Sequence, residues 1–489
     1  MPGKYGEGTT QTLSEFSAEV KYEEIPKEVT HQTKRLILDS IAAALGGYSS
    51  EKGRIVRSFV AKLGGIPEAS VLGNSKKTSA TQAAFANANM GNSIDIDDTI
   101  LMTHPAVPTI MGALAVAEGN HSSGKDFITA VATGYDMAVR IGGASDSWLK
   151  IEDGKIKTLP VHGYSWHTFG AAVAAAKILG LDAKQFVHVF GLGAGLAPIP
   201  FMAQWAKPVD DLPLSKYYEA GWTTQGGVAA AMLAAEGYTG PAEVLEGYSG
   251  FWRMRGRPDC DFKFMVQNMG DHWWIMETAL KAWPCCRFIH QSLTAFNQVL
   301  IGNDIEPEDI EKIVIKGGMM YAPIFYVRHP VAPVNIQFSA PHAFAALAYS
   351  ITPGPAWQYP ETAADPKIKE FRDRVFIEPE RATLLDMAPD LSGERPRQPK
   401  KVPTTVEVTT HGKVYSAHAD FAKGDPPQWV EGMALSDAEI IQKFRNQAVG
   451  VAEVSGKWSE QVEDAIKIIM NLENLKDINE LTRLLAFRV

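Results

Sequence analysis

The residues most suited to chemistry gather between positions 92 and 105, in the stretch NSIDIDDTILMTHP. Asp95, Asp97 and Asp98 lie too close together to be ionised in one cleft without nearby cations or a raised carboxyl pKa. His104 titrates near neutrality and can accept or donate a proton. The stretch therefore indicates proton transfer.

Two other interpretations of the same stretch stay open. Thr99 can donate a hydrogen bond to an anionic substrate, but an Asp-Asp-Thr run before an apolar helix is also ordinary N-capping chemistry. Alternatively, the three aspartates could supply oxygen ligands to Mg²⁺, although their spacing matches no EF-hand loop. We therefore predict a catalytic or capping cluster rather than a metal site.

Further candidates follow in the first half of the chain. His162 and His167 precede an alanine-rich helix whose N-terminus would favour a bound carboxylate. Each histidine is also typical of a capping or core side chain. Lys207 and Lys216 offer positive charge, but most lysines are solvated surface groups.

A third group lies in KAWPCCRFIH, residues 281–290. Arg287 and His290 provide cationic groups beside an apolar stretch, and Cys286 is either a nucleophile or a small buried hydrophobe. The chain has three cysteines, two of them adjacent, so we expect neither a disulfide scaffold nor an iron–sulfur cluster. The glycines of 191–195 lack a nucleotide-binding spacing and indicate close helix contact instead.

Composition limits the possible functions. The chain has 489 residues, which favours two domains, and a net charge of -9 with no basic stripe, which argues against nucleic acid. A small anionic substrate is compatible with that charge if cations gather locally. The N-terminus lacks the apolar core of a secretory signal, and the apolar runs are too short to span a bilayer, so we expect a cytoplasmic protein without membrane contact.

Periodicity predicts a mainly helical first half and a mixed α/β region after residue 268. Apolar faces and glycine stops indicate helices over 26–47, 108–118, 126–140, 170–181 and 226–236. Alternation predicts strands over 312–316 and 404–410, the second turning at His411-Gly412, and the proline-rich region 352–403 is expected to form loops. Helical patterns return over 436–448 and 461–472. We predict a large all-α domain of residues 1–268 and 430–489, with a smaller α/β lid domain inserted at 269–429.

Taken in order, these segments resemble the MmgE/PrpD family of cofactor-independent enzymes. The resemblance runs nearly end to end and is carried by DIDDT at 95–99 with His104-Pro105, FGAA at 169–172 with KILGLD at 177–182, GYTGP at 237–241, residues 281–290, and KFR at 443–445. It implies a large helical domain, an α/β lid, an active site between them, no cofactor or metal, and a homodimer.

The resemblance also implies roles for particular residues. Asp95, Thr99 and His104 match the family's polar cluster, His162 fits its next histidine with His167 as a rival, and the family lysine falls on Lys216 with Lys207 as a displaced alternative. The residue contributed by the lid falls near Cys286 or His290.

The segment KYYE at 216–219 departs from the lysine-proline-leucine-histidine common in relatives, so Glu219 replaces a family histidine.

From these residues and the resemblance, we expect a lyase that acts on a small di- or tricarboxylate by dehydration or decarboxylation. We expect Asp95, His104, His162 and Lys216 to take part in catalysis. The expected substrate-binding residues are Thr99, His167, Lys207, Cys286, Arg287 and His290. The alternatives are an epimerase or isomerase of a small dicarboxylate, a divalent-metal hydrolase, and a non-catalytic binding protein.

Overall fold

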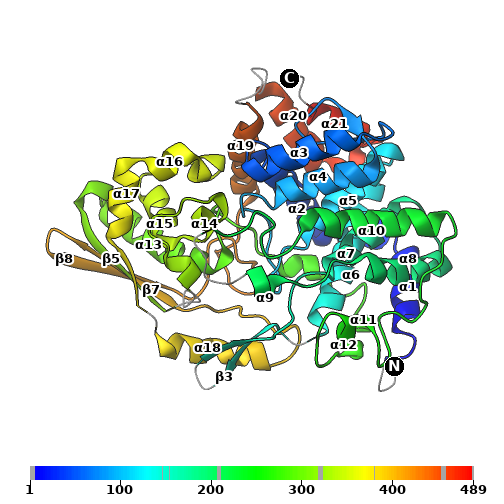
Figure 1. Cartoon of the computed structure of the whole chain (residues 1–489), viewed down its shortest axis with the longest axis horizontal. Helices are drawn as coiled ribbons and strands as arrows, with labels where there is room; N and C mark the ends of the chain where they lie inside the picture. The colour runs from blue at the N-terminus through cyan, green and yellow to red at the C-terminus, as the bar shows by residue number, and fades with distance from the viewer. Residues whose placement is uncertain are drawn as a thin grey trace.

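A computed structural model describes residues 6–145, 147–152, 155–205, 211–317, 323–378, 380–452 and 459–486. Figure 1 shows a helical body that contains both ends of the chain and, beside it, a lid built around a four-stranded sheet. The mainly α architecture with a smaller α/β part is confirmed. The boundaries at residues 268 and 430 stay a prediction.

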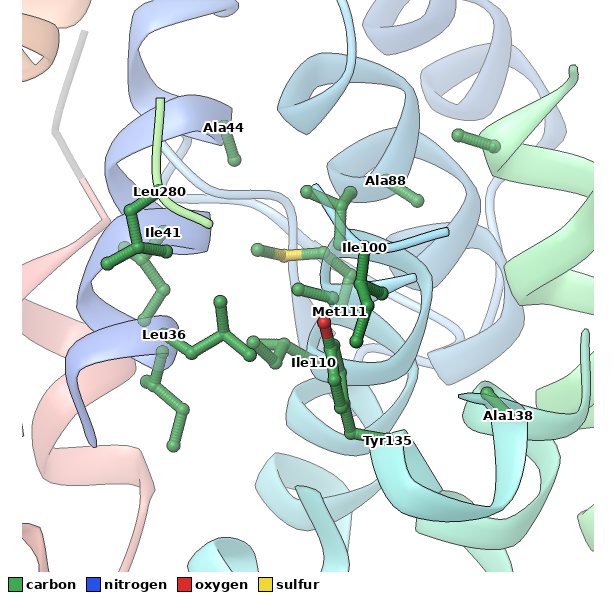
Figure 2. Close-up of a cluster of buried hydrophobic side chains, with 14 of the residues drawn as sticks. Leu36, Ile41, Ala44, Ala88, Ile100, Ile110, Met111, Tyr135, Ala138 and Leu280 are labelled. Atoms are coloured by element: carbon green, nitrogen blue, oxygen red, sulfur yellow. The ribbon is translucent and has the colours of Figure 1, made fainter. Parts of the chain in front are cut away.

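The helical body is a set of closely packed helices rich in alanine and glycine. Its central helices are α2 (Lys27–Gly46), α4 (Ala80–Gly91), α5 (Ala106–Gly119), α6 (Gly124–Gly143), α7 (His167–Ile178) and α10 (Ala220–Ala235). α6 and α7 can approach closely because Gly134 has no side chain. A Cβ atom at this position would lie only 2.6 Å from the carbonyl oxygen of Gly170. Figure 2 shows the resulting core, in which side chains of α2, α5 and α6 gather, among them Leu36, Met111 and Tyr135.

Peripheral elements complete the body. They are the helices α1 (Thr9–Glu19), α3 (Glu51–Leu63), α8 (Ala183–Leu196), α9 (Met202–Trp205), α11 (Phe251–Met254), α12 (Phe262–Val266), α19 (Asp437–Ala452), α20 (Ser459–Met470) and α21 (Asn479–Leu484), and the hairpins β1 (Ala69–Ser70) with β2 (Lys77–Thr78) and β3 (Leu149–Glu152) with β4 (Lys155–Thr158). Helix α19, which follows the lid in the chain, packs along α2, so the chain returns to the body after forming the lid.

The lid sheet has the strand order β6-β5-β7-β8, formed by β5 (Ile310–Gly317), β6 (Val375–Glu378), β7 (Thr404–Thr410) and β8 (Lys413–Ala419). β5 and β6 are parallel, and the other neighbours are antiparallel. β7 alternates buried and half-buried residues, as expected for a strand with one face on a core. His411 and Gly412 both have positive φ, 49° and 68°, which suits the tight turn between β7 and β8.

The remaining lid elements are helices that flank the sheet or join it to the body. They are α13 (His290–Asn303), α14 (Pro333–Phe338), α15 (Ala340–Ala348), α16 (Pro360–Ala364), α17 (Pro366–Asp373) and α18 (Arg381–Ser392), with 3-10 turns η2 (Trp274–Glu277), η3 (Arg287–Ile289), η5 (Pro323–Tyr326) and η6 (Pro355–Gln358). α18 lies against the β3–β4 hairpin of the body (Figure 1).

The predicted strands and the turn between β7 and β8 are confirmed, and each predicted helix is present with ends shifted by a few residues. The prediction of loops over residues 352–403 is wrong, because α16, α17, β6 and α18 lie there. Prolines open α16 and α17 at their first turn rather than interrupting them. The β1–β2 and β3–β4 hairpins were not predicted, since strands of two to four residues are too short to show alternation. Among the helices of the described residues, none is long and apolar enough to cross a membrane.

Candidate active site

The acidic stretch forms a buried irregular loop, residues 92–98, between α4 and α5. Buried backbone carbonyls outside regular structure need hydrogen-bond donors. Side chains from distant parts of the chain supply these donors, one to each carbonyl from 92 to 96: Lys216 to Asn92 (2.8 Å), Gln337 to Ser93 (2.7 Å), Gln358 to Ile94 (2.7 Å), Lys281 to Asp95 (3.0 Å) and Lys443 to Ile96 (2.8 Å). Body and lid therefore fix this loop together.

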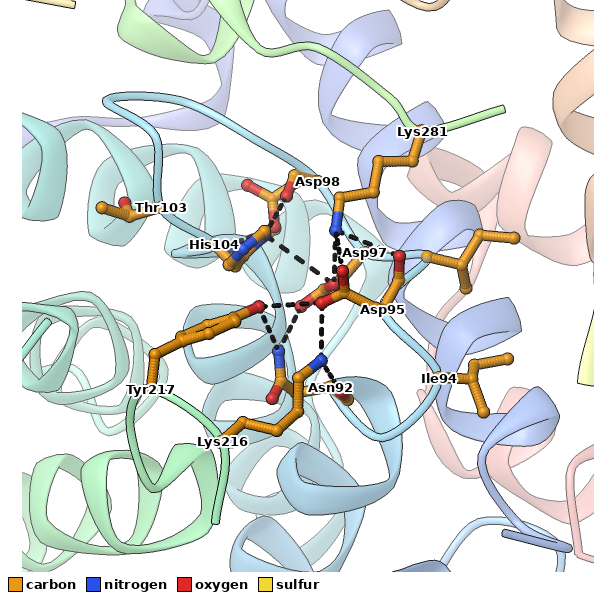
Figure 3. Close-up of polar contacts among 12 residues, drawn as sticks. Asn92, Ile94, Asp95, Asp97, Asp98, Thr103, His104, Lys216, Tyr217 and Lys281 are labelled. Carbon is orange, nitrogen blue, oxygen red and sulfur yellow. Dashed lines mark hydrogen bonds and ion pairs between the residues drawn. The ribbon is translucent and has the colours of Figure 1, made fainter. Parts of the chain in front are cut away.

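Asp95 is the centre of the charge network in Figure 3. Its carboxylate lies 2.5 Å from Lys216 Nζ and 3.4 Å from Lys281 Nζ, and it accepts a hydrogen bond of 2.9 Å from the Tyr217 hydroxyl. Burial raises the pKa of Asp95, but the two ammonium groups outweigh burial and hold that pKa well below its usual range. Asp95 is therefore a buried, permanently charged carboxylate.

The two lysines differ in their electrostatic balance. Burial lowers the pKa of Lys216, and the attraction of Asp95 and Asp97 only partly restores it. Burial also opposes the charge on Lys281, but the same two carboxylates raise the pKa of that lysine above its ordinary value. Lys281 Nζ lies 3.6 Å from Asp97 as well, so this lysine bridges the two carboxylates.

Asp98 has a different role from its neighbours. Its carboxyl accepts a hydrogen bond from the backbone N–H of Ala106 at 3.2 Å, at the start of α5, and one from the Tyr135 hydroxyl at 3.2 Å. Burial and the nearby charge of Asp97 raise the pKa of Asp98 well above its ordinary value. Asp98 therefore binds the first backbone N–H of α5, although Pro105 occupies the N-cap position of that helix. Asp95 and Asp97 belong to the charge network.

His104 is held as a neutral imidazole. Its Nδ1 lies 2.6 Å from the backbone oxygen of Asp98, and because a carbonyl oxygen only accepts, Nδ1 carries the proton and Nε2 the lone pair. Burial lowers the pKa of His104 to about 4, even though Asp97 lies 3.7 Å away. The ring stacks on Tyr217 with a centroid distance of 5.3 Å. His104 is thus fixed in position with one nitrogen free to accept a proton.

A cavity of about 310 Å³ lies next to this network, between the body and the lid. Its polar edge contains Thr99, His104, His162, Tyr164, Tyr217 and Arg287. The Thr99 hydroxyl is buried without a hydrogen-bond partner in the described structure, and the Arg287 guanidinium pairs with the buried carboxylate of Asp425. Unused donors beside charged groups fit an anionic ligand.

His162 presents a second imidazole to the same cavity. Its Nδ1 lies 2.5 Å from the Leu159 carbonyl oxygen, so Nε2 again carries the lone pair, and the ring stacks on Trp148 at 5.1 Å. Burial lowers the pKa of His162. The cavity therefore has two neutral imidazoles in the same tautomeric state.

Apart from Thr158 and Cys286, the rest of the cavity wall is apolar. It consists of aromatic and methionine side chains from the β3–β4 hairpin region, from α9 and from the lid: Trp148, Met202, Trp205, Phe288, Phe325 and Phe338. Cys286 also borders the cavity, and burial raises the pKa of its thiol to about 12, so the sulfur is a thiol rather than a thiolate.

Backbone strain is concentrated around the site. Asp95, Met102 and Lys216 have positive φ angles of 59°, 58° and 57°, a region that residues other than glycine adopt infrequently. Such conformations persist where the surroundings over-determine them, and they cluster at functional sites. At Asp95 and Lys216 the fixing contact is their mutual ion pair.

Other predicted residues lie away from the cavity edge. Lys216 is fully buried in the charge network and is not among the described lining residues. His167 begins α7, is fully buried, and has Nε2 3.1 Å from the Thr103 hydroxyl. His290 is buried at the start of α13 with Nε2 3.3 Å from the Cys285 carbonyl oxygen. Lys207 lies outside the described residues.

Sequence reasoning included Lys281 in a cationic segment and Tyr217 among residues that could shape the pocket, but gave neither a specific role, and it missed the two glutamines that bind the loop. A signal for Lys281 was present, because a single lysine in the apolar run from Ala279 to Trp283 is either exposed or paired. No comparable signal marked Gln337 or Gln358, since neutral amides are common in both surface and buried positions.

The acidic loop does not suit a metal ion. Among the described residues, no group of three or more histidine, cysteine, aspartate or glutamate side chains is arranged to hold one. The Asp95 carboxylate, the first candidate ligand, is already neutralised by two lysines, which would repel a dication. The site's positive charge is supplied by protein side chains.

A second cavity, of about 260 Å³, borders the other side of the loop at Ser93 and Ile94 and is lined by Lys52 and Arg54. Its described lining includes neither imidazole, so we place the chemistry in the cavity of His104 and His162.

The fold and site define a two-part protein in which a helical body and an α/β lid enclose a cavity with paired imidazoles beside a lysine-neutralised aspartate. The sequence matches the MmgE/PrpD N-terminal domain over residues 11–262 and the MmgE/PrpD C-terminal domain over residues 283–467, and the chain belongs to this family.

Several relatives share the name cis-aconitate decarboxylase. The Aspergillus terreus protein of that name is 27% identical over 316 residues, which cover 60% of this chain and 60% of the relative. The Homo sapiens protein is 25% identical over 491 residues, 95% of this chain and 92% of the relative, and the Mus musculus protein is 24% identical over 502 residues, 97% and 93%. The chain thus matches little more than half of the fungal relative but nearly all of the mammalian ones.

Proposed function

We propose that this protein is a cofactor-independent lyase that removes water or carbon dioxide from a small di- or tricarboxylic acid, next to a carboxylate. The observation that carries the proposal is His104, a neutral imidazole whose Nε2 is free to accept a proton at the edge of a cavity. A base with these properties is what proton abstraction beside a carboxylate requires.

In the dehydration mode, His104 Nε2 takes a proton from the carbon next to the substrate carboxylate. The electron pair of the broken C–H bond forms the carbon–carbon double bond, and the hydroxyl group leaves as water after the His104 imidazolium transfers the abstracted proton to it. In the decarboxylation mode, carbon dioxide leaves, its bonding electrons remain on the substrate carbon, and a proton that His104 or His162 takes up from solvent is transferred to that carbon framework. Negative charge builds on the substrate carboxylate in both modes, and fixed cations stabilise it.

The remaining residues hold the substrate or the base. Thr99 and Arg287 bind carboxylate oxygens, and Cys286 contacts the substrate as a neutral thiol. Lys216 acts with Asp95 to fix the loop and the local potential, because its ammonium group is already bound in that network. We retain Lys207, His167 and His290 as further candidates for substrate binding.

Two lines of support are independent of each other. Several relatives, two of them matched over nearly their full length, carry the name cis-aconitate decarboxylase. Separately, the described site provides acid–base groups and cations from amino-acid side chains, so the proposed steps need no metal or cofactor. We also propose a homodimer, which light scattering of the purified protein would test.

One specific observation favours a second candidate function. His104 and His162 border one cavity. An epimerase needs two acid–base groups, one that removes a proton from one face and one that takes up a proton from solvent and returns it to the other face. The product distinguishes the two reactions.

Proton NMR in deuterium oxide tests both candidates with one panel of methylcitrate, citrate, cis-aconitate, itaconate and iminodisuccinate. A lyase produces a new alkene, consumes an existing alkene by addition of water, or releases carbon dioxide. An epimerase incorporates deuterium and forms only a stereoisomer. Absence of both changes across the panel, and across wider carboxylic acids, would contradict the proposal.

A further inference from the structure

The apolar wall of the cavity is more extensive than a small, highly charged substrate requires. Trp148, Trp205, Phe288, Phe325 and Phe338 all border the same space of about 310 Å³, a size typical of pockets for ligands larger than a few carbon atoms. These side chains come from separate segments of body and lid, so the wall is assembled by the fold rather than by one apolar helix.

Positive charge in the cavity lining is limited, although Arg257, outside the lining, acts electrostatically on His162 and Tyr164. In the described part of the lining, Arg287 is the one lysine or arginine, and its guanidinium is paired with the buried Asp425. Lys216 and Lys281 are engaged by Asp95 and Asp97. A third substrate carboxylate placed against the aromatic wall would lose its hydration without gaining an ion pair, which is unfavourable.

The residues that border the cavity thus fall into two chemical groups. The polar edge, with Thr99, His104 and Arg287, suits carboxylates and the reacting carbon. The aromatic wall suits an uncharged hydrocarbon or aryl group, because burial of apolar surface is favourable and aromatic rings stack on one another. The two groups are in contact, because His162 stacks on Trp148.

We infer that the substrate is a carboxylic acid with one or two carboxylates at its reacting end and an uncharged, bulky apolar substituent at the other. This inference rests on the proposed function for the place of the reacting carbon. It differs from that proposal in excluding a tricarboxylate as the preferred substrate.

A matched series of maleates tests the inference. Carboxymethyl-, methyl-, butyl- and benzylmaleate share the reacting alkene and the two carboxylates and differ in one substituent. Turnover is followed by proton NMR, and binding to the same protein by titration calorimetry. Because one methylene in an apolar pocket changes kcat/KM by about 10–200-fold, we expect butyl- or benzylmaleate to exceed carboxymethylmaleate by at least about tenfold.

The outcomes separate the two proposals. Preference for carboxymethylmaleate, or equal turnover of the series, overturns the inference and leaves the lyase intact. If no maleate reacts or exchanges a proton, the lyase proposal is contradicted for this class, and binding alone decides the inference. Tighter binding of benzylmaleate than of carboxymethylmaleate then supports it, and equal or weaker binding overturns it.

A pair of variants makes the same test within the protein. Phe338→Leu shortens the apolar wall, whereas Phe371→Leu makes the same change in the buried face of α17, outside the described cavity lining. We expect the benzyl-to-methyl ratio of kcat/KM, or of binding constants, to fall about tenfold in the first variant and to stay unchanged in the second. Equal ratios in the two variants would overturn the inference.

Discussion

The Nδ1 atom of His104 lies 2.6 Å from the backbone oxygen of Asp98, whose side chain accepts a hydrogen bond from the Ala106 N–H at the start of α5. One residue thus positions both the base and the start of α5. The contact sets the tautomer of His104, and burial makes the charged form of the ring unfavourable.

The burial of His104 and its contact with Asp98 predict the pH below which activity is lost. The pKa of His104 is lowered to about 4, so Nε2 is available above that pH and becomes protonated below it. We expect kcat/KM of the free enzyme to fall as pH decreases through about 4, rather than through the usual histidine value near 6.5. A pH–rate profile restricted to conditions where circular dichroism shows folded protein checks this. An acid limb near 6.5 would contradict a buried, neutral His104.

The same shift affects stability. Between about pH 6.5 and 4 the unfolded chain binds a proton at this position and the folded chain does not, so this group lowers the free energy of unfolding as pH decreases through that window. Urea denaturation at a series of pH values measures the total slope. The His104→Gln variant should show a smaller slope between these pH values, and an identical slope would contradict the assignment.

Removal of Lys281 tests the buried charge network. Lys281→Met leaves Asp95 and Asp97 with one fewer cation, and breaking a buried ion pair in this way costs about 3–5 kcal/mol. The matched control is Lys401→Met, which removes a more exposed partner of Asp420 at 2.8 Å and should cost no more than about 1 kcal/mol. Chemical denaturation of both variants measures the difference. Equal losses would contradict the proposed role of Lys281.

Thr99 provides a test of substrate binding with little effect on the fold. Its hydroxyl has no partner in the described structure, so Thr99→Val should lower kcat/KM by about tenfold through loss of one substrate hydrogen bond while the free energy of unfolding hardly changes. Thr103→Val is the control, because the Thr103 hydroxyl donates to Ile100 at 3.0 Å and its loss should reduce stability. Unchanged kinetics in Thr99→Val would remove Thr99 from the site.

Much of the fold was predictable because helical and strand periodicities are local. The pattern before Gly47 predicts α2, and the His411-Gly412 turn predicts the β7–β8 hairpin. The helices within 352–403 were not predicted, because proline was interpreted as a breaker there although at a helix N-terminus it is well tolerated.

The site was predictable where its residues are adjacent in sequence and not where they are far apart. The stretch from Asp95 to His104 could be recognised because its aspartates, threonines and histidine are close together in the sequence. Lys281 donates to a carbonyl 186 residues away, and no local pattern specifies that pairing. Likewise, sequence spacing did not separate His162 from His167, whereas the structure places His162 at the cavity and His167 against Thr103 inside the body.

The aromatic wall illustrates the same limit. Trp205, Phe288, Phe325 and Phe338 each have the character of an ordinary core residue, and only the packing of lid on body brings them to one cavity. Sequence reasoning therefore named residues of the charge network and not these aromatic residues that border the cavity.

The most direct test of the claim that His104 is the general base compares the parent protein with His104→Gln and His121→Gln. Turnover of a substrate that the parent converts is followed by proton NMR in deuterium oxide. His121 is an exposed histidine paired with Asp477, and we assign it no role in the reaction. It therefore serves as a control for the effect of replacing a histidine by glutamine. We predict that His104→Gln folds normally but loses at least about a hundredfold in kcat, together with proton exchange, as expected for removal of a general base. His121→Gln should match the parent. Turnover by folded His104→Gln at the parent's rate would contradict the assignment of His104 as the base.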